Sequence, residues 1–308
     1  MEYSEFISMF NDGGATVPAH TSGTTGTPKA VRLLKSDMRL SARATNEFFG
    51  IDGGSVLAIP LSADYIAGKM MAVRALEAEC RLLSITPGND FELPEGVNVS
   101  LLAIVPSQID ALERHPEWTS RVRNVLVGGA PPSEEALRRL CGMGYTVFVS
   151  YGMTETCSHV ALARGDDRCR VFEAMPGISF GCDSRGCLTV NAPDRSFGSL
   201  QTNDVVDLID DRHFRWLGRA DNVINSGGIK IHPEQIEAAI AALLPHLDFY
   251  IGGEPDGKWG TRAVLYYEDG DPAAIAAAIE KAVPDRRLRP KALVKRHIRR
   301  TASGKIRR

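Results

Sequence analysis

Short apolar runs alternate with amphipathic stretches through the first half of the chain. Strands are expected at five such runs, residues 55–60, 80–85, 101–105, 124–127 and 146–149. Between them apolar residues recur with helical spacing, which predicts helices at 36–49 with Ser36 as N-cap, 61–76, 106–115 and 133–141. Repeated strand–helix units with apolar strands are typical of a mostly parallel sheet covered by helices on both faces. The pattern therefore predicts an α/β fold.

The pattern changes beyond residue 165. Glycine-broken segments at 186–190, 198–208 and 213–217 alternate polar and apolar positions, which favours an antiparallel sheet or a small β-barrel-like part. A polar hinge and a glycine-split hairpin follow at 218–231. We expect the domain boundary there, with a core domain over 1–220.

Residues 221–308 are expected to form a second, mobile α+β domain. Its predicted elements are a helix at 233–244, strands near 249–251 and 263–267, and a helix at 271–282, followed by a basic tail. About ninety residues are enough for a domain that folds alone.

A loop rich in hydroxyl groups lies close to the N-terminus. Residues 20–31 read HTSGTTGTPKAV, and apolar segments at 14–19 and 30–34 flank the loop like the two strands of a hairpin. Backbone N–H groups in such a loop can close around phosphate oxygens. It is not a Walker A motif, because Gly26 is followed by Thr-Pro-Lys and Pro28 lacks an N–H donor. It is either a nucleotide phosphate loop or an ordinary Ser/Thr/Gly turn.

Two of the predicted parallel strands end in unusual residues. Gly128–Pro132 follows one strand and residues 150–156 follow the next. Ligands bind beyond the carboxyl ends of strands in open parallel sheets. Tyr151 can stack on a flat ring, and Glu155 with Thr154 offers oxygen ligands for Mg²⁺. The alternative is a pair of tight turns, the second closed by a threonine that caps a helix.

Composition and charge narrow the class of protein to which the sequence can belong. The chain has 308 residues, 44% of them hydrophobic and 24% charged, and a formal net charge of -2. These values are typical of a soluble globular protein and provide no strong field to recruit nucleic acid or an anionic membrane. No apolar run approaches the roughly 20 residues of a membrane helix, and residues 1–11 lack the pattern of a secretory leader. We therefore expect a cytoplasmic protein without a membrane or nucleic-acid partner.

The tail and the cysteines leave alternatives open. Residues 281–308 hold twelve Lys or Arg and one acidic residue, and form either a solvated surface or a site for a polyphosphate or nucleic acid. No two of the six cysteines have the two-residue spacing of zinc or redox motifs, so reduced thiols are expected. The alternatives are a metal site of Cys169, Cys182 and Cys187 with His159, or a loop cluster of those thiols that oxidises.

Eight motifs resemble those of the adenylate-forming superfamily of acyl- and aryl-CoA synthetases, adenylation domains of nonribosomal peptide synthetases, and luciferases. In the family's order they lie at 21–29, 128–131, 151–156, 202–204, 218–221, 226–228, 255–260 and 303–305. Together they cover the chain from about residue 20 to its end. A chance match of eight ordered motifs is negligible, so the resemblance favours the ligand-binding interpretations above.

The resemblance implies a two-step reaction that uses ATP, Mg²⁺ and coenzyme A. A small-molecule carboxylic acid attacks the α-phosphate of ATP to give an acyl-AMP and pyrophosphate, and a thiol then displaces AMP. In-line phosphoryl chemistry of this kind needs mainly charge neutralisation and positioning.

The resemblance also implies residue roles. Glu155 would hold Mg²⁺, Thr154 would contact the α-phosphate, and Lys305 would bridge that phosphate and the attacking carboxylate. Asp221 would be the hinge about which the small domain rotates. ATP and AMP binding is implied for Thr21, Ser22, Gly23, Thr24, Thr25, Gly26, Lys29, Gly129, Ala130, Tyr151, Gly152, Asp204 and Arg219. A CoA tunnel is implied for Ser226, Gly227 and Gly228.

The chain departs from the family pattern in two places. Asn203 stands where the ribose motif usually has glycine, while Asp204 is retained. Relatives carry a whole N-terminal subdomain before the phosphate loop, where this sequence has about twenty residues. We expect exposed apolar surface there, which would favour a homodimer.

Within the superfamily the sequence looks most like the o-succinylbenzoate-CoA ligases of menaquinone biosynthesis. Residues 65–71 and 154–162 carry this likeness. Lys69 and His159 are candidates to bind the acid's second carboxylate, although Lys69 could equally form a structural salt bridge. Rival interpretations are another aryl- or acyl-CoA ligase, a carrier-loading adenylation enzyme, an ATP-binding pseudoenzyme, or a nucleic-acid binder built on the basic tail.

Overall fold

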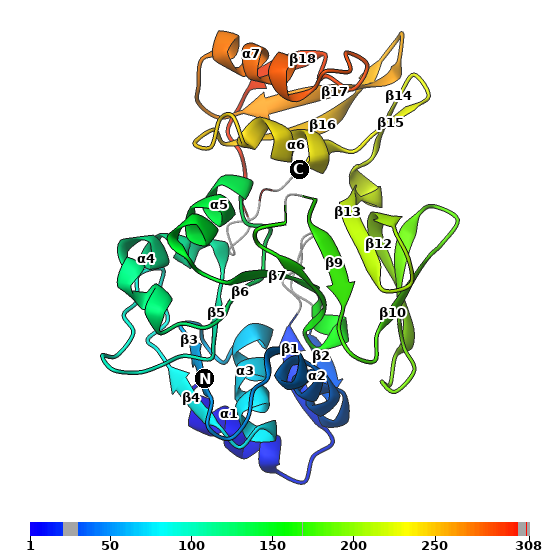
Figure 1. Ribbon diagram of the computed structural model, residues 1–308. Helices are drawn as coiled ribbons and strands as arrows, with labels where there is room; N and C mark the ends of the chain where they lie inside the picture. Colours follow the sequence, from blue (N-terminus) through cyan, green and yellow to red (C-terminus); the bar gives the residue numbers. More distant parts are fainter. Residues whose placement is uncertain (21–29, 168, 301–305, 307–308) are drawn as a thin grey trace.

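The chain folds into a large domain and a smaller one joined near residue 220 (Figure 1). The computed structural model describes residues 1–20, 30–167, 169–300 and 306. The predicted phosphate loop and Lys305 lie outside these residues. Among the described residues, no helix is both long and apolar enough to cross a membrane.

An eleven-stranded sheet forms the large domain, with the order β10-β11-β12-β13-β9-β8-β7-β6-β5-β3-β4. Its parallel half contains β3 (Val56–Ile59), β4 (Arg81–Ser84), β5 (Leu101–Ile104), β6 (Val125–Val127) and β7 (Val147–Gly152). Its antiparallel half contains β8 (His159–Arg164), β9 (Val171–Ala174), β10 (Ser179–Cys182), β11 (Cys187–Ala192), β12 (Gly198–Leu208) and β13 (His213–Arg219). The predicted α/β class is confirmed.

The parallel half is covered by helices on both faces because successive connections cross from strand to strand in two opposite directions along the sheet. The helices are α3 (Ile66–Glu77), α4 (Ile109–Arg114) and α5 (Glu134–Met143). The connection through α3 leads from β3 to the β4 edge, whereas those through α4 and α5 lead from β5 to β6 and β7. Since such crossovers are right-handed, opposite directions of travel place the helices on opposite faces.

The predicted barrel-like part is an open, curved half of the same sheet. Among the strands that the structure describes, the hydrogen-bonded order ends at β10 and does not close. Rings from β7, β9, β10 and β13 cluster inside the curve: Phe214 lies 5.1 Å from Tyr151, 5.3 Å from Phe172 and 4.9 Å from Phe180 between ring centroids. Burial of these rings curls the strands, so the prediction of a separate barrel-like part is not confirmed.

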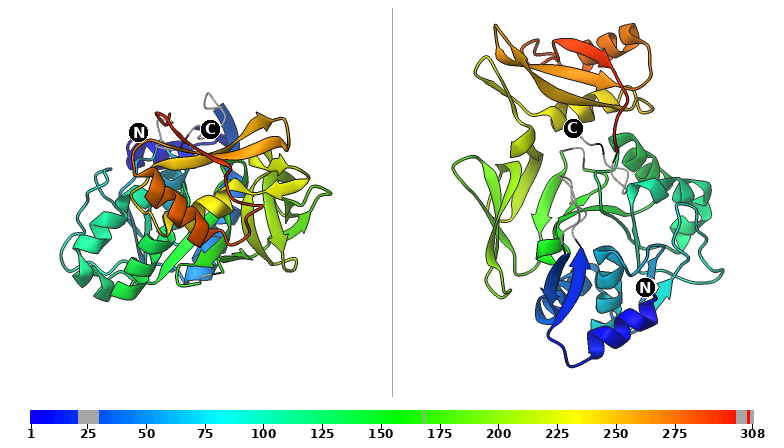
Figure 2. Two further views of the ribbon diagram at one scale, coloured as in Figure 1. Left: turned by 90° about the horizontal axis from the view of Figure 1, so that it is seen from above. Right: turned by 180° about the vertical axis from the view of Figure 1, so that it is seen from behind.

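The N-terminal region builds a second apolar core. It contains α1 (Tyr3–Asn11), α2 (Lys35–Phe49) and the antiparallel hairpin of β1 (Thr16–His20) and β2 (Ala30–Leu34). Phe6 and Phe10 of α1 are buried with Met38 of α2 and Val73 of α3. Figure 2 shows α1 at the end of the large domain that is remote from the small domain. The prediction that the hydroxyl-rich loop joins two strands of a hairpin is confirmed.

Several predicted boundaries were wrong. Helix α2 begins at Lys35 directly after β2, so Ser36 is not its N-cap. The strand predicted at 80–85 is the shorter β4, which is the last strand of the sheet and is partly exposed. The 3₁₀ turn η1 (Pro106–Gln108) precedes α4, and η2 (Pro116–Ser120) follows it.

The small domain contains a three-stranded sheet, a two-stranded hairpin and two helices. It comprises β14 (Ile224–Ser226), β15 (Ile229–Ile231), α6 (Pro233–Ala241), β16 (Phe249–Asp256), β17 (Gly260–Tyr267), α7 (Pro272–Ala282) and β18 (Ala292–Lys295). Its core includes Ile231, Ile240, Ile251, Leu265 and Ile275 and is separate from those of the large domain. The turn η4 (Ala220–Asn222) lies between β13 and β14. The exact domain boundary stays a prediction.

Candidate functional site

Two strand ends meet at one edge of the sheet. β6 and β7 are parallel neighbours, so the runs that follow them lie together. A side chain at Gly128 would place its Cβ 2.7 Å from Ser150 Oγ, and Gly129 has a φ of +83°. The backbone of the first run therefore packs closely on Ser150 of the second run.

The turn after β7 is held by one buried threonine. Thr156 Oγ1 accepts the Met153 N–H at 3.2 Å and lies 2.7 Å from the Ser158 carbonyl oxygen. A Cβ on Gly152 would lie 2.3 Å from that same oxygen, so only glycine fits. The turn alternative is thus partly correct, because Thr156 stabilises η3 (Thr154–Thr156).

Glu155 is the exposed carboxylate of this turn, and Thr154 beside it is buried. Among the described residues, no group of three or more His, Cys, Asp or Glu side chains could hold a metal ion. A single accessible carboxylate fits Mg²⁺, which proteins commonly bind through one or two carboxylates together with substrate phosphates. Glu155 therefore fits the predicted role, which stays a prediction.

Asp204 of β12 is the centre of a hydrogen-bonded cluster. It is buried and accepts the Tyr151 hydroxyl at 2.8 Å on one carboxylate oxygen. Its other oxygen accepts the Trp216 indole N–H at 3.2 Å and lies 3.5 Å from an Arg219 guanidinium nitrogen. Burial and the Asp204 charge raise the pKa of Tyr151 well above its usual value, so its hydroxyl stays a donor. The structure thus brings Tyr151, Asp204 and Arg219 together from three strands.

Trp216 is the member of this cluster that the sequence analysis missed. It lies on β13, three residues before Arg219 in a run of alternating polar and apolar positions. A tryptophan in such a run is usually explained by packing, so the sequence gives no signal for its hydrogen bond. Only the pairing of β12 with β13 places its indole N–H on Asp204.

Asn203 and the expected hinge residue are in contact. The Asn203 amide nitrogen lies 3.4 Å from Asp221 Oδ2, and Arg219 lies 3.3 Å from the same oxygen. The departure from the family's glycine therefore adds a polar contact to Asp221.

The predicted CoA hairpin packs under an aromatic ring. Gly227 has a φ of +59°, and a Cβ there would lie 2.7 Å from Trp259 Cε3. The Gly227 N–H donates to the Trp259 carbonyl oxygen at 2.9 Å, while Asp256 Oδ1 accepts the Trp259 N–H at 3.0 Å. The structure therefore brings the motifs at 226–228 and 255–260 together.

Lys69 and His159 contact different residues. The buried Lys69 ammonium donates to the carbonyl oxygens of Ala63 at 2.6 Å and Asp64 at 2.9 Å. His159 Nε2 lies 3.0 Å from Thr45 Oγ1. The structure does not bring the two candidates into one cluster, and their role toward the acid stays a prediction.

Arg74 is a buried cation that the sequence analysis also missed. It is 2% exposed and donates to Ser158 Oγ at 2.6 Å. Burial lowers the pKa of Arg74 to about 9. Burial also lowers the pKa of His159 well below its usual value, and the charges of Arg74 and Arg195 add to this shift. His159 is therefore a neutral imidazole in the folded protein.

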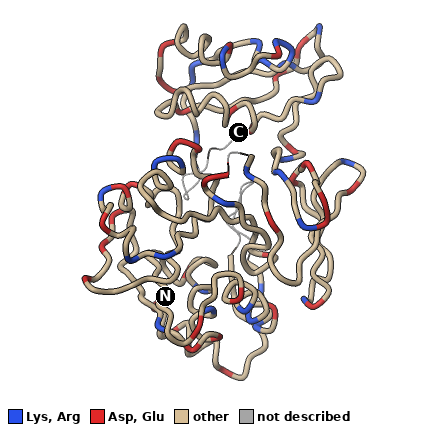
Figure 3. Tube along the Cα trace, viewed as in Figure 1, with Lys and Arg blue, Asp and Glu red and all other residues tan. Residues whose placement is uncertain are grey.

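Part of the basic tail pairs with acidic side chains. Lys295 pairs with Asp269, His297 with Glu268, and Arg300 with Asp248. Figure 3 shows basic and acidic positions interspersed over both domains. These pairs favour the solvated-surface interpretation of the tail. The six cysteines are free thiols, as expected.

Comparison with known proteins identifies the family. The model of the family described as "AMP-binding enzyme" matches residues 16–180, more than half of the chain. The chain belongs to the AMP-binding enzyme family. Both the predicted resemblance and the fold class are thereby confirmed.

The similar proteins include several ligases. The chain is 26% identical over 328 residues to a 2-succinylbenzoate--CoA ligase of Enterococcus faecalis, with 93% of this chain and 67% of that protein covered. It is 28% identical over 280 residues to a probable 2-succinylbenzoate--CoA ligase of Mycobacterium tuberculosis, with 84% and 72% covered.

Solved structures share the fold. An acyl-CoA synthetase (AMP-forming)/AMP-acid ligase II-like protein of Dyadobacter fermentans is 32% identical, with a TM-score of 0.66 and coverage of 98% of this chain and 90% of that one. O-succinylbenzoate coenzyme A synthetase of Bacillus subtilis, solved with ATP and magnesium ion, has a TM-score of 0.79 at 20% identity, with 94% and 68% covered.

Replacement of Trp216 by phenylalanine should weaken AMP binding about tenfold. The ring volume is largely kept, but Asp204 loses the donor on one oxygen, which corresponds to about 1.4 kcal/mol. Calorimetric titration of AMP measures this, and Trp259→Phe is the matched control on the small domain. Equal affinity in Trp216→Phe and the native protein would contradict a positioning role.

Acid should destabilise the protein partly through His159. Its folded-state pKa lies below the unfolded value, so the unfolded chain binds the proton more readily. Stability is therefore complete above about pH 6.5 and falls as the pH decreases below it, by about 1.4 kcal/mol per pH unit for one proton. Urea unfolding between pH 5 and 8 should give a shallower acid slope for His159→Gln, whereas the exposed His246→Gln should keep the native slope. An unchanged slope in His159→Gln would argue against a buried neutral imidazole.

Proposed function

We propose that the protein is an ATP-dependent acid–CoA ligase that converts o-succinylbenzoate to o-succinylbenzoyl-CoA in menaquinone biosynthesis. The observation that carries the proposal is the cluster of Tyr151, Asp204 and Arg219 near the strand end that bears Thr154 and Glu155. These residue types suit an adenosine ribose and a phosphate–Mg²⁺ group respectively. The names of the similar ligases supply the acid and the thiol.

The first step joins the acid to AMP. A carboxylate oxygen attacks the α-phosphorus of ATP, the bond from that phosphorus to the bridging oxygen breaks, and pyrophosphate leaves with the electron pair. Bound at Glu155, Mg²⁺ would neutralise phosphate charge. Asp204 accepts the ribose hydroxyls, and its three donors keep the carboxylate in one orientation. Lys305 neutralises the charge between the two reactants.

The second step moves the acyl group to sulfur. The thiolate of CoA attacks the acyl carbonyl carbon, the bond to the AMP oxygen breaks, and AMP leaves. The hairpin tip at Gly227 lines the path of the thiol, and its contact with Trp259 keeps that tip in one conformation. Rotation about Asp221 exchanges Lys305 for the hairpin at the reacting group.

The remaining assignments have unequal support. Lys69 and His159 are proposed to bind the second carboxylate of the acid, although the carbonyl contacts of Lys69 favour a structural role for its ammonium.

A cytoplasmic location without a nucleic-acid partner agrees with the small net charge. A homodimer stays a proposal. The exposed large hydrophobic residues are scattered and provide little support: Met1, Tyr65, Ile209, Leu243 and Trp259.

The native protein should release pyrophosphate from ATP with o-succinylbenzoate, at a kcat/KM at least tenfold above that for benzoate or a fatty acid. A coupled pyrophosphate assay without and with CoA measures both steps. Preference for another acid would contradict the proposed substrate but keep the ligase. ATP binding without pyrophosphate release for any acid would indicate a pseudoenzyme.

Lys305→Ala should lower acyl-AMP formation about 10²- to 10³-fold, the scale of losing one preorganised charge-stabilising group. Thioester formation from supplied acyl-AMP should persist, because the hairpin and not Lys305 serves that step. Single-turnover assays of the two half-reactions measure this, with the exposed helical Lys281→Ala as control. Equal loss in both half-reactions would refute alternation of the small domain.

A further inference from the structure

A buried guanidinium lies beside the turn that carries Thr154 and Glu155. Arg195 is 7% exposed, and one of its terminal nitrogens donates to the carbonyl oxygen of Thr156 at 3.3 Å. Thr156 directly follows Glu155 and closes η3. The guanidinium therefore acts on the backbone next to the carboxylate that is proposed to hold Mg²⁺.

The chain bends sharply just after this carbonyl group. Cys157 has a φ of +66°, although it is not glycine, and its N–H donates to the Thr154 carbonyl oxygen at 2.9 Å. A residue with a side chain is strained in this conformation unless its surroundings hold it there. The hydrogen bond from Arg195 to the preceding carbonyl oxygen is a contact that holds the turn.

Two tight turns present Arg195 from the connection between β11 and β12. The Arg195 N–H donates to the Ala192 carbonyl oxygen at 2.9 Å. The Gly198 N–H donates in turn to the Arg195 carbonyl oxygen at 2.9 Å. A short, hydrogen-bonded loop thus sets the position of the guanidinium.

The residue after Arg195 joins this loop to a third element. Asp37, in the first turn of α2, accepts the Ser196 N–H at 3.1 Å and also accepts the Ser196 hydroxyl. Asp37 is buried like Arg195. Buried charged groups are costly unless they are hydrogen-bonded, and both of these groups are. Arg195 and Ser196 therefore bridge α2 and the turn after β7.

Helix α2 ties this bridge to the hairpin around residues 21–29. It begins directly after β2, and the N–H of its first residue, Lys35, donates to the carbonyl oxygen of Ala15 at 2.9 Å, directly before β1. The family resemblance assigns residues 21–29 to ATP, and the proposed function places Mg²⁺ at Glu155. Because Mg²⁺ requires near-ideal octahedral geometry, the carboxylate and the phosphates must reach it in fixed relative positions.

We propose that Arg195 is a positioning residue for the Mg²⁺–ATP complex. It keeps the Glu155 turn in the orientation that the metal requires, and Asp37 fixes this support to the hairpin around residues 21–29. The proposal rests on the proposed function, because that function supplies the metal at Glu155. Partners that orient a metal ligand without touching the metal contribute about 10- to 100-fold to metal affinity or activity.

Calorimetric titration of Mg²⁺ at a fixed ATP concentration tests the proposal. Arg195→Ala should raise the apparent dissociation constant for Mg²⁺ about tenfold. Its affinity for adenosine, which has no phosphates, should stay native. Added guanidinium ion, at a concentration that leaves the native protein folded, should restore part of the Mg²⁺ affinity. Unchanged Mg²⁺ dependence in Arg195→Ala, or an equal loss of adenosine affinity, would overturn the proposal.

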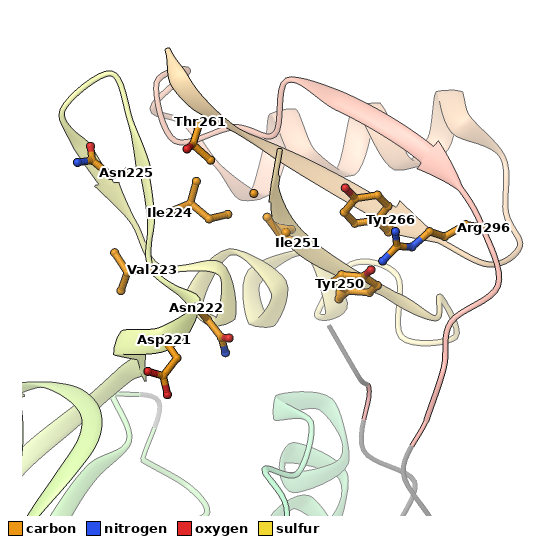
Figure 4. Close-up of a pocket in the computed structure, with 12 residues that line it drawn as sticks. Asp221, Asn222, Val223, Ile224, Asn225, Tyr250, Ile251, Thr261, Tyr266 and Arg296 are labelled. Atoms are coloured by element: carbon orange, nitrogen blue, oxygen red, sulfur yellow. The ribbon is translucent and has the colours of Figure 1, made fainter. Parts of the chain in front are cut away.

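Two matched variants remove guanidinium groups elsewhere. Arg212 also donates to backbone carbonyl oxygens, those of Ile178 and Ala174 in the same sheet region. Arg296 stacks on two tyrosine rings beside the pocket of the small domain (Figure 4). Arg212→Ala and Arg296→Ala should keep the native Mg²⁺ dependence, even where thermal unfolding shows a loss of stability. A shift in either variant as large as that in Arg195→Ala would overturn the positioning role.

Two conservative variants test the bridge if Arg195→Ala does not fold. Arg195→Lys keeps the charge and loses the planar fork, so it should show a smaller shift in Mg²⁺ affinity. Asp37→Asn removes the charge that accepts the Ser196 donors and should shift Mg²⁺ affinity in the same direction. Native Mg²⁺ affinity in both variants would overturn the proposal.

The half-reactions separate this proposal from the proposed function. In Arg195→Ala, acyl-AMP formation should require about tenfold more Mg²⁺, and thioester formation from supplied acyl-AMP should persist. Acyl-AMP formation with the native Mg²⁺ requirement would overturn the positioning role and leave the ligase standing. The expected change in Mg²⁺ binding, together with no acyl-AMP formation by the native protein for any acid, would contradict the ligase and leave the positioning role standing.

Discussion

The hydrogen bond between Tyr151 and Asp204 is the constraint on which the large domain depends. Their strands, β7 and β12, are four positions apart in the sheet, or about 19 Å along a flat surface. The hydroxyl nevertheless lies 2.8 Å from the carboxylate. The antiparallel half must therefore curl toward the parallel half, and the buried ring of Phe214 fills the space inside the curve.

This curvature joins chemistry from both halves of the sheet. The parallel half ends in the turn that carries Thr154 and Glu155, and the antiparallel half supplies Asp204, Trp216 and Arg219. An isolated buried carboxylate is costly, and the three donors on Asp204 offset that cost. The same contacts keep Asp204 rigid, so the stability of the curved sheet and the geometry of the site have one cause.

The connection to the small domain uses the same neighbourhood. Arg219 lies near both Asp204 and Asp221, so the end of β13 links the hydrogen-bonded cluster around Asp204 to the expected hinge. Asn203 stands where the family usually has glycine, and its amide nitrogen adds a contact to Asp221. Movement of the small domain would therefore change contacts directly beside Asp204. Beyond the expected hinge, Trp259 packs on the tip of the β14–β15 hairpin at Gly227.

The sequence by itself determined the α/β class, most helices and strands, the hairpin around residues 21–29 and the family, because periodicity and ordered motifs are local properties. It also placed Tyr151, Asp204 and Arg219 in one site through resemblance. Only the tertiary structure revealed Trp216 on Asp204, Arg74 beside His159 and Trp259 on Gly227. The reason is physical: these contacts join strands and helices distant in sequence, and no local pattern records which side chains a curved sheet brings together.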